Sequence, residues 1–115
     1  LYLRRITGNS MYPTLRDGDY IWASKRLLSH YRQGDIVLVD HPLYTRIVKR
    51  IKHIDKDGQY WLVGDGIDSV SSLQMGPVSN RQILAECFGT FILSTSSNNN
   101  TIATQFAALV PSGFK

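Results

Sequence analysis

The chain has 115 residues, the size of one domain, and 43% of them are hydrophobic, which excludes a disordered tail. Its net charge of +4 is ordinary for a solvated surface, so nucleic acid is not an expected partner. The one cysteine, Cys87, excludes an intrachain disulfide and a cysteine-rich metal site, and its apolar neighbours favour a buried position.

Short runs of β-branched and aromatic residues alternate with Gly-Asp and Asp-Gly turn signals along the chain. The expected strands are residues 20–23, 36–39, 45–54, 60–63 and 83–93. The third and fourth are joined by a segment containing Asp57-Gly58, which is typical of a β-hairpin turn. Residues 82–87 also fit a helical turn. The spacing predicts a mainly β fold, either a coiled antiparallel sheet or a partly open β-barrel.

The composition changes near residue 93. Residues 94–100 contain only Ser, Thr and Asn, which indicates a polar linker, and residues 101–110 are apolar but only about half a membrane span. We therefore expect a domain over residues 1–93 and a C-terminal segment of unassigned role over 94–115. No signal peptide is visible. The chain begins at Leu1 rather than Met, which leaves open an upstream membrane anchor or partner domain.

Ser10 is a candidate nucleophile. A nucleophilic serine needs a constrained turn, a base, and hydrogen-bond donors for the oxyanion. Gly8 allows a substrate to approach the backbone closely, and Pro13 fixes the chain just after the serine. On this local pattern alone, an ordinary turn serine is the better interpretation.

Lys49 is the candidate base. On a strand over residues 45–54 it would share one face with Ile47 and Ile51. Such neighbours would desolvate the ammonium and lower its pKa, leaving a neutral amine able to accept a proton. The competing interpretation is a surface lysine that extends its ammonium into water.

The three histidines, His30, His41 and His53, match no metal-ligand spacing. Their polar or charged neighbours favour surface or turn positions. A Ser-His-Asp triad stays open, because such triads occur in several chain orders, but no local pattern favours it.

Four segments resemble, in order, the motifs of the signal peptidase I family of serine–lysine proteases. Residues 8–15 read Gly-Asn-Ser-Met-Tyr-Pro-Thr-Leu and are followed by Gly18-Asp19. Residues 34–39 read Gly-Asp-Ile-Val-Leu-Val, residues 47–51 read Ile-Val-Lys-Arg-Ile, and residues 64–78 run from Gly-Asp to Gly-Pro-Val. The compact spacing looks most like the small maturation proteases of nickel superoxide dismutase and the mitochondrial inner-membrane peptidases.

This resemblance implies a β-rich fold of the signal peptidase–LexA type, with Ser10 as nucleophile, Lys49 as general base, and neither metal nor other cofactor. The backbone N–H of Ser10 would be one oxyanion donor. Family members often place a serine two residues before the nucleophile, where this chain has Gly8, so Thr7 or Asn9 is expected to supply the second donor. Ser69 is expected to hydrogen-bond Lys49. The substrate is expected to contact Met11, Tyr12 and Pro13.

The fourth segment departs from the family pattern. Ser72 matches the serine of a family Asp-Ser-Arg, but its neighbours are Ser71 and Leu73, so the usual local ion pair is absent.

Three functions stay open. The favoured one is an endopeptidase that removes a leader or signal segment from a precursor polypeptide. The others are a LexA-like self-cleaving regulatory domain and a catalytically inactive peptide-binding relative.

The expected localisation depends on the sequence upstream. With an upstream anchor we expect a membrane-associated protein that contacts the membrane surface, and otherwise a cytoplasmic one.

Overall fold

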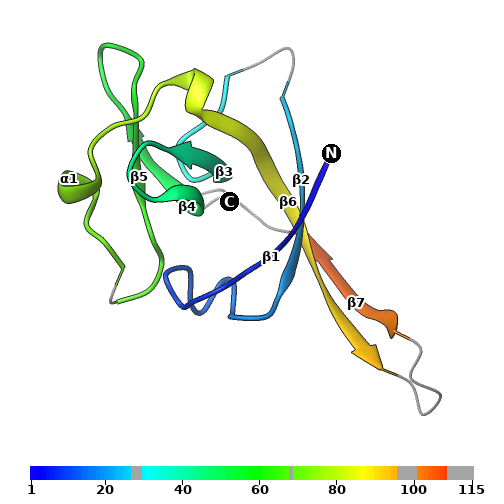
Figure 1. Cartoon of the computed structure of the whole chain (residues 1–115). Helices are drawn as coiled ribbons and strands as arrows, with labels where there is room; N and C mark the ends of the chain where they lie inside the picture. The colour runs from blue at the N-terminus through cyan, green and yellow to red at the C-terminus, as the bar shows by residue number, and fades with distance from the viewer. Residues whose placement is uncertain (27–29, 68, 96–100, 109–115) are drawn as a thin grey trace.

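The computed structural model of the chain describes residues 1–26, 30–67, 69–95 and 101–108, with side chains through Phe91. Within these ranges the fold is mainly β, as the sequence predicted (Figure 1). The strands form one antiparallel sheet in the order β1-β2-β6-β3-β4-β5, and β7 pairs with the far half of β6. No helix in the described ranges is long and apolar enough to cross a bilayer.

The five predicted strands agree with the structure apart from their ends, and two further strands, β1 and β7, were not predicted. The strands are β1 (Tyr2–Arg5), β2 (Tyr20–Ser24), β3 (Ile36–His41), β4 (Thr45–Ile54), β5 (Tyr60–Val63), β6 (Ile83–Thr95) and β7 (Thr101–Ala108). Two short helices, α1 (Ser72–Met75) and the 3-10 helix η1 (Asn80–Gln82), lie between β5 and β6. The structure therefore selects the long strand, rather than the helical turn, for the residues after Gln82.

The core has two parts because alternate residues of a strand point to opposite faces of the sheet. The first cluster is Ile6, Met11, Leu15, Ile21, Ala23, Ile36, Leu38, Ala85 and Cys87. The second cluster is Tyr31, Val37, Val39, Ile51, Tyr60, Leu62, Met75, Val78 and Ile83. In β3, Ile36 and Leu38 thus belong to the first cluster, and Val37 and Val39 to the second. The sheet is buried on both faces at this strand.

Cys87 is buried in the first cluster, as its neighbours predicted. Burial, with a smaller effect from the charge of Glu86, raises the pKa of its thiol to about 12. The thiol is therefore protonated at neutral pH and is not a candidate nucleophile.

The segment after residue 93 is more regular than the sequence indicated. β6 continues to Thr95, and β7 pairs with it in antiparallel register, with Thr95 opposite Thr101 and Gly89 opposite Ala108. Figure 1 shows this hairpin projecting from the rest of the molecule. Residues 96–100 of the expected linker and 109–115 lie outside the described residues. A domain boundary near residue 93 stays a prediction.

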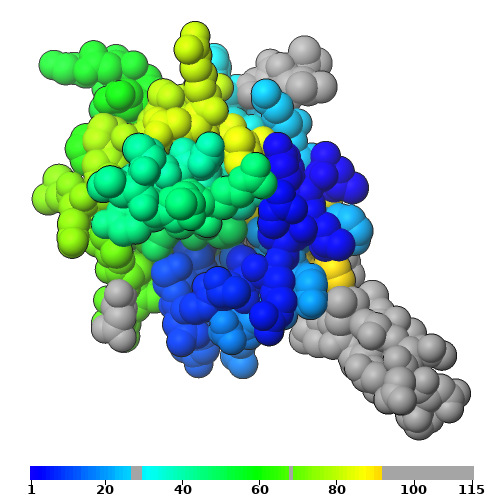
Figure 2. Space-filling model, viewed as in Figure 1, coloured from blue at the N-terminus to red at the C-terminus, as the bar shows by residue number. Residues whose placement is uncertain are grey.

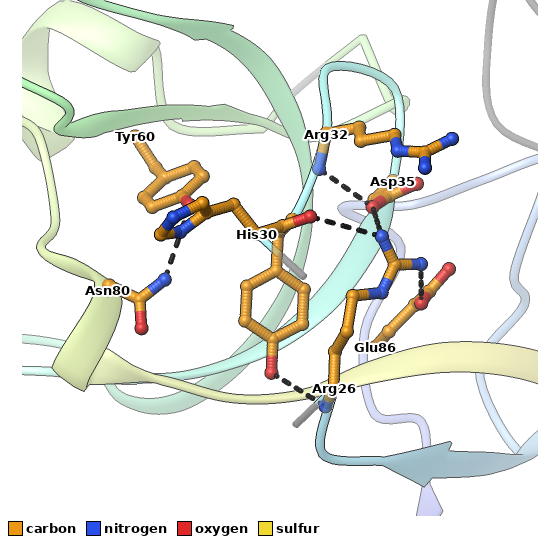
Figure 3. Close-up of polar contacts among 8 residues, drawn as sticks. Arg26, His30, Arg32, Asp35, Tyr60, Asn80 and Glu86 are labelled. Carbon is orange, nitrogen blue, oxygen red and sulfur yellow. Dashed lines mark hydrogen bonds and ion pairs between the residues drawn. The ribbon is translucent and has the colours of Figure 1, made fainter. Parts of the chain in front are cut away.

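The turn before β3 is held by Arg26 (Figure 3). The Arg26 guanidinium forms an ion pair with Glu86 of β6, and its Nη1 lies 3.6 Å from Oδ2 of Asp35. Asp35 is buried, with only 3% of its surface exposed. It also donates a hydrogen bond to the carbonyl of His30 at 3.2 Å, and lies 5.8 Å from the ring centroid of Tyr31. These contacts fix the turn that contains Gly34 against the sheet.

Candidate active site

Ser10 lies on a tight turn between β1 and β2. Gly8 has φ of 83°, a left-handed conformation that glycine adopts without strain. The turn is closed by backbone hydrogen bonds from Tyr12 N to Asn9 O (3.1 Å) and from Leu15 N to the Met11 carbonyl oxygen (2.9 Å). Met11 and Leu15 are buried in the first cluster, and burial of each contributes about 2 kcal/mol to holding the turn on the core.

The loop after β5 packs directly on this turn. The amide of Gly66 donates a hydrogen bond to the carbonyl of Ser10 at 2.8 Å. A Cβ atom at Gly64 would lie 2.4 Å from the Ser10 carbonyl oxygen, and one at Gly66 would lie 2.3 Å from the Asn9 carbonyl oxygen. Both distances are shorter than any tolerable contact. Glycine at these two positions is what allows the loop to reach the serine turn.

A hydrogen-bond network joins all four segments that resembled family motifs. Thr14 Oγ1, in the serine turn, donates to Asp65 Oδ2 at 2.6 Å. Arg50 donates to Asp65 through Nε (2.9 Å) and Nη2 (2.7 Å), and through Nη1 to the Gly34 carbonyl (2.8 Å). A bidentate pair of this kind fixes both position and orientation. Asp65 therefore connects the serine turn to β4 at the residue next to Lys49.

The ion pair sets the protonation state of Asp65. Burial alone would raise the pKa of this carboxyl, but hydrogen bonds from Arg50 and Thr14 and the charge of Arg50 outweigh it. The net effect lowers the pKa below its ordinary value of 3.8. Asp65 is thus ionised throughout the neutral range and compensates the Arg50 guanidinium.

Lys49 is buried, with 5% of its surface exposed, and is not the surface lysine of the competing interpretation. It lies opposite Val37 in the sheet, on the face that Ile47 and Ile51 share. Those neighbours belong to or pack on the second cluster. This burial lowers the pKa of the Lys49 amine from its ordinary value of 10.5, which favours the neutral base.

The segment after β5 contacts both the serine turn and the second cluster. Gly64 and Gly66 approach the serine turn, while Val70 packs on the second cluster, as Ile47 does. Among the described residues, no hydrogen bond joins the Ser10 hydroxyl to the Lys49 amine. Ser69 Oγ donates to the Gly64 carbonyl at 3.3 Å, and the expected hydrogen bond between Ser69 and Lys49 stays a prediction.

Two hollows meet at Ser10. The first, a groove of about 390 Å³, is bordered by Thr7, Ser10 and Met11 on one side and by residues 44–48 on the other. Figure 2 shows the N-terminal atoms beside those of the β3–β4 region. The second, more open hollow is bordered by Asn9, Tyr12, Pro13 and residues 65–67. The expected oxyanion and substrate residues therefore divide between the two sides of Ser10, and Met11 also belongs to the core.

The groove runs between two strand edges. Among the strands that the structure describes, β1 pairs only with β2. β4 pairs with β3 from Thr45, but with β5 only from Arg50 onward, so residues 45–49 have one unpaired edge among the described strands. Unpaired backbone edges on both walls can accept an extended peptide by β-strand addition. An extended polypeptide is therefore one ligand that this groove can accept.

The histidines have structural roles or lie on the surface. His41 is buried: its Nδ1 accepts hydrogen bonds from the amides of Leu43 (3.0 Å) and Tyr44 (3.3 Å), and its Nε2 lies 3.1 Å from the Met75 carbonyl. It holds a turn, as predicted, but from the interior. His53 stacks on Trp61 and His30 is exposed. In the part of the chain that the structure describes, no three His, Cys, Asp or Glu side chains are grouped to hold a metal.

Sequence reasoning gave Arg50 and Asp65 no role beyond their motif positions. The structure contains an ion pair between these two residues, at positions other than those of the family's local pair, where this chain has Ser71 and Leu73. The sequence does show an arginine directly after Lys49, on an expected strand, and an aspartate directly after Gly64. Their 15-residue separation concealed the contact.

A family model described as Peptidase S24-like matches residues 1–68, more than half of the chain. The match covers β1 to β5, the Ser10 turn, Lys49 and Asp65. No curated protein and no solved structure matches the chain significantly. The comparison supports a peptidase domain of the S24/LexA type and does not distinguish the signal peptidase I family that the motifs resembled.

Proposed function

The chain belongs to the Peptidase S24-like family, and from this premise we propose that it is a serine endopeptidase with Ser10 as nucleophile and Lys49 as general base. The observation that supports this most is the network through Asp65. It joins the turn of Ser10, by way of Thr14, to Arg50 beside the buried lysine. A buried lysine with a lowered pKa and a serine on an anchored turn are the two groups that nucleophilic catalysis without a histidine would need.

The proposed reaction has two stages. The neutral Lys49 amine accepts the proton of the Ser10 hydroxyl as Oγ bonds to the scissile carbonyl carbon. Lys49 then donates this proton to the departing amine as the C–N bond breaks, leaving an acyl-enzyme. Next, Lys49 deprotonates a water molecule whose oxygen bonds to the acyl carbon. Lys49 returns this proton to Ser10 Oγ as the ester C–O bond breaks and the product leaves with its new carboxyl group. The oxyanion would be stabilised by the Ser10 amide together with Thr7 or Asn9.

The substrate of this proposal is an extended polypeptide in the groove between β1 and β4. Backbone hydrogen bonds to the two strand edges would position the scissile carbonyl at Ser10, and Met11, Tyr12 and Pro13 would contact the adjoining residues. The resemblance of the motifs to signal peptidase I favours a precursor from which a leader or signal segment is removed.

Incubation of the protein with a complex peptide mixture, followed by mass spectrometry of new termini, tests the proposal. Wild-type protein should generate a defined set of cleavages that disappear in Ser10→Ala and Lys49→Ala. Lys52→Ala is the matched control, because Lys52 is an exposed lysine on the same strand. Cleavage that persists in folded Ser10→Ala protein would disprove the assignment.

Self-cleavage is the second candidate, favoured by the S24-like match. An intramolecular reaction would shorten the intact chain at a rate independent of protein concentration. Cleavage of added peptides with the chain left intact supports the endopeptidase. A shortened chain with no cleavage of added peptides supports the self-cleaving domain.

A further inference from the structure

The groove beside Ser10 is rich in arginine. Its walls include Arg4 and Arg5 at the end of β1 and Arg46 near the start of β4. No aspartate or glutamate is among the described residues that border it. An extended peptide bound between the two strand edges would therefore lie close to positive charge on both walls.

Strand register places two of these arginines on the groove side of the sheet. Arg4 is opposite Ile21, a member of the first cluster, and directly opposite residues share a face. Arg46 shares its face with Val48, which is opposite Leu38 and packs on the same cluster. Arg4 and Arg46 thus border the groove from its two walls on the same face of the sheet.

Few carboxylates offset this charge. Within the described residues neither Arg4 nor Arg46 has a carboxylate within 4.0 Å. Arg4 donates to its neighbour's carbonyl, that of Leu3, and lies 5.2 Å from the Tyr2 ring centroid. Asp40 is opposite Arg46 in the sheet and exposed, so it offsets part of the charge of that wall.

The other nearby acids are engaged elsewhere. Asp65 is bound by Arg50, and Asp35 and Glu86 are bound by Arg26. Asp17 and Asp19 accept backbone amides of the serine turn, from Gly8 and Arg16 respectively. These carboxylates keep their charge but do not border the groove, so the guanidinium groups are the charges closest to a bound substrate.

We propose that the groove selects polypeptides with an acidic side chain close to the scissile bond. Arg4, Arg46 and Ser10 border the same groove, so the preferred acidic residue lies within a few residues of the cleaved bond. This inference rests on the proposed function in its choice of an extended peptide, but it concerns binding and needs no catalysis.

Peptide binding to the inactive Ser10→Ala protein tests the proposal. The probes are fluorescein-labelled ten-residue peptides of Ala, Ser and Thr in which one Glu or one Lys is moved along the chain, and fluorescence anisotropy reports affinity. At low salt the best Glu peptide should bind about five- to tenfold tighter than its Lys counterpart, the effect of one or two exposed ion pairs. The preference should weaken at high salt.

Charge reversal assigns the preference to the groove. Arg4→Glu and Arg46→Glu, each in the Ser10→Ala background, should abolish or invert the preference for Glu. Arg81→Glu is the matched control, because Arg81 is exposed on η1 and does not border the groove; it should keep the preference. Equal binding of Glu and Lys peptides, no binding of either, or an effect of Arg81→Glu equal to that of Arg46→Glu would overturn the inference.

The same peptides given to active protein separate this inference from the proposed function. Cleavage without any preference for acidic residues leaves the endopeptidase standing and overturns the acidic specificity. Selective binding of Glu peptides to Ser10→Ala protein, without cleavage by wild type, supports the specificity and contradicts the endopeptidase.

Discussion

At the scale of single residues, the most informative feature is the burial of the ionisable side chain of Lys49. Its amine is polar, yet the residue is as buried as a core residue. No acidic partner for it lies among the described residues. Folding must therefore remove the ammonium from water or leave the amine neutral. A lysine buried at such a position lowers stability, and the proposed catalytic role would account for its presence there.

Replacement of Lys49 by methionine should separate stability from activity. Lys49→Met should abolish cleavage and raise the free energy of unfolding by on the order of 1 kcal/mol, because an apolar side chain of similar length suits this site better. The lowered pKa means that the native state releases its proton before the unfolded state does. Wild-type stability should thus rise with pH between the lowered pKa and 10.5, and the advantage of Lys49→Met should shrink over that range.

Urea unfolding of both proteins at several pH values measures this effect. Lys52→Met, at an exposed position of the same strand, is the control and should show no comparable trend. A Lys49→Met protein less stable than wild type at neutral pH would contradict the account of a desolvated amine.

At the scale of elements, the site depends on how closely the loop after β5 approaches the serine turn. Gly66→Ala would place a methyl group against the Asn9 carbonyl. Because this carbonyl is part of the backbone, the clash can be relieved only if the serine turn or the loop moves. We expect a loss of about 1–3 kcal/mol in stability and a larger proportional loss of activity, because Ser10 itself is displaced.

Gly58→Ala gives a matched control for that change. Gly58 also has a conformation that favours glycine, with φ of 79°, but a Cβ there meets no atom within 4 Å. This variant should lose about 1 kcal/mol of stability and keep full activity per folded molecule. Activity measured against the folded fraction compares the two. Equal loss of activity in both variants would show that the loop contact does not position Ser10.

The elements themselves were largely predictable from sequence, for a physical reason in each case. β3 and β4 are continuous apolar or alternating runs bounded by glycine and aspartate turns, and both were found. β1 was missed because its four residues end in Arg4 and Arg5, which do not look like a strand until β2 pairs with them. β7 was missed because its pairing with β6 is a tertiary property of the hairpin.

The site was predictable only in part. Burial of Lys49 followed from Ile47 and Ile51 on its own face. The Asp65 network did not follow, because no local pattern indicates which arginine a distant aspartate binds. The contact of Ser69 with Gly64 rather than Lys49 likewise depends on the path of the loop.

At the scale of the whole molecule, Asp65 holds together segments that are far apart in sequence. Asp65→Asn should cost about 2–3 kcal/mol, because Arg50 is left buried without its counter-charge. The lowered pKa of Asp65 means that its contribution is present above pH 3.8 and is lost as pH falls through the native-state value. Wild type and Asp65→Asn should therefore converge in stability in acid.

Thermal unfolding of wild type and Asp65→Asn at several pH values between 2 and 7 measures whether their stabilities converge. Asp57→Asn is the control, since Asp57 is an exposed residue of the β4–β5 turn. A difference between wild type and Asp65→Asn that stays constant down to pH 2 would mean that the ion pair is not its source.

The most direct test of the central claim is the pH dependence of acylation at Ser10. A serine-directed acylating probe would be followed by intact mass, with peptide mapping to locate the adduct. We expect one adduct, on Ser10, that forms faster as pH rises and reaches a plateau below pH 10.5 as the Lys49 amine loses its proton. The adduct should be absent from Ser10→Ala and at least about 100-fold slower in Lys49→Met. An unlabelled Ser10 in folded protein, or equal labelling rates with and without Lys49, would contradict the account.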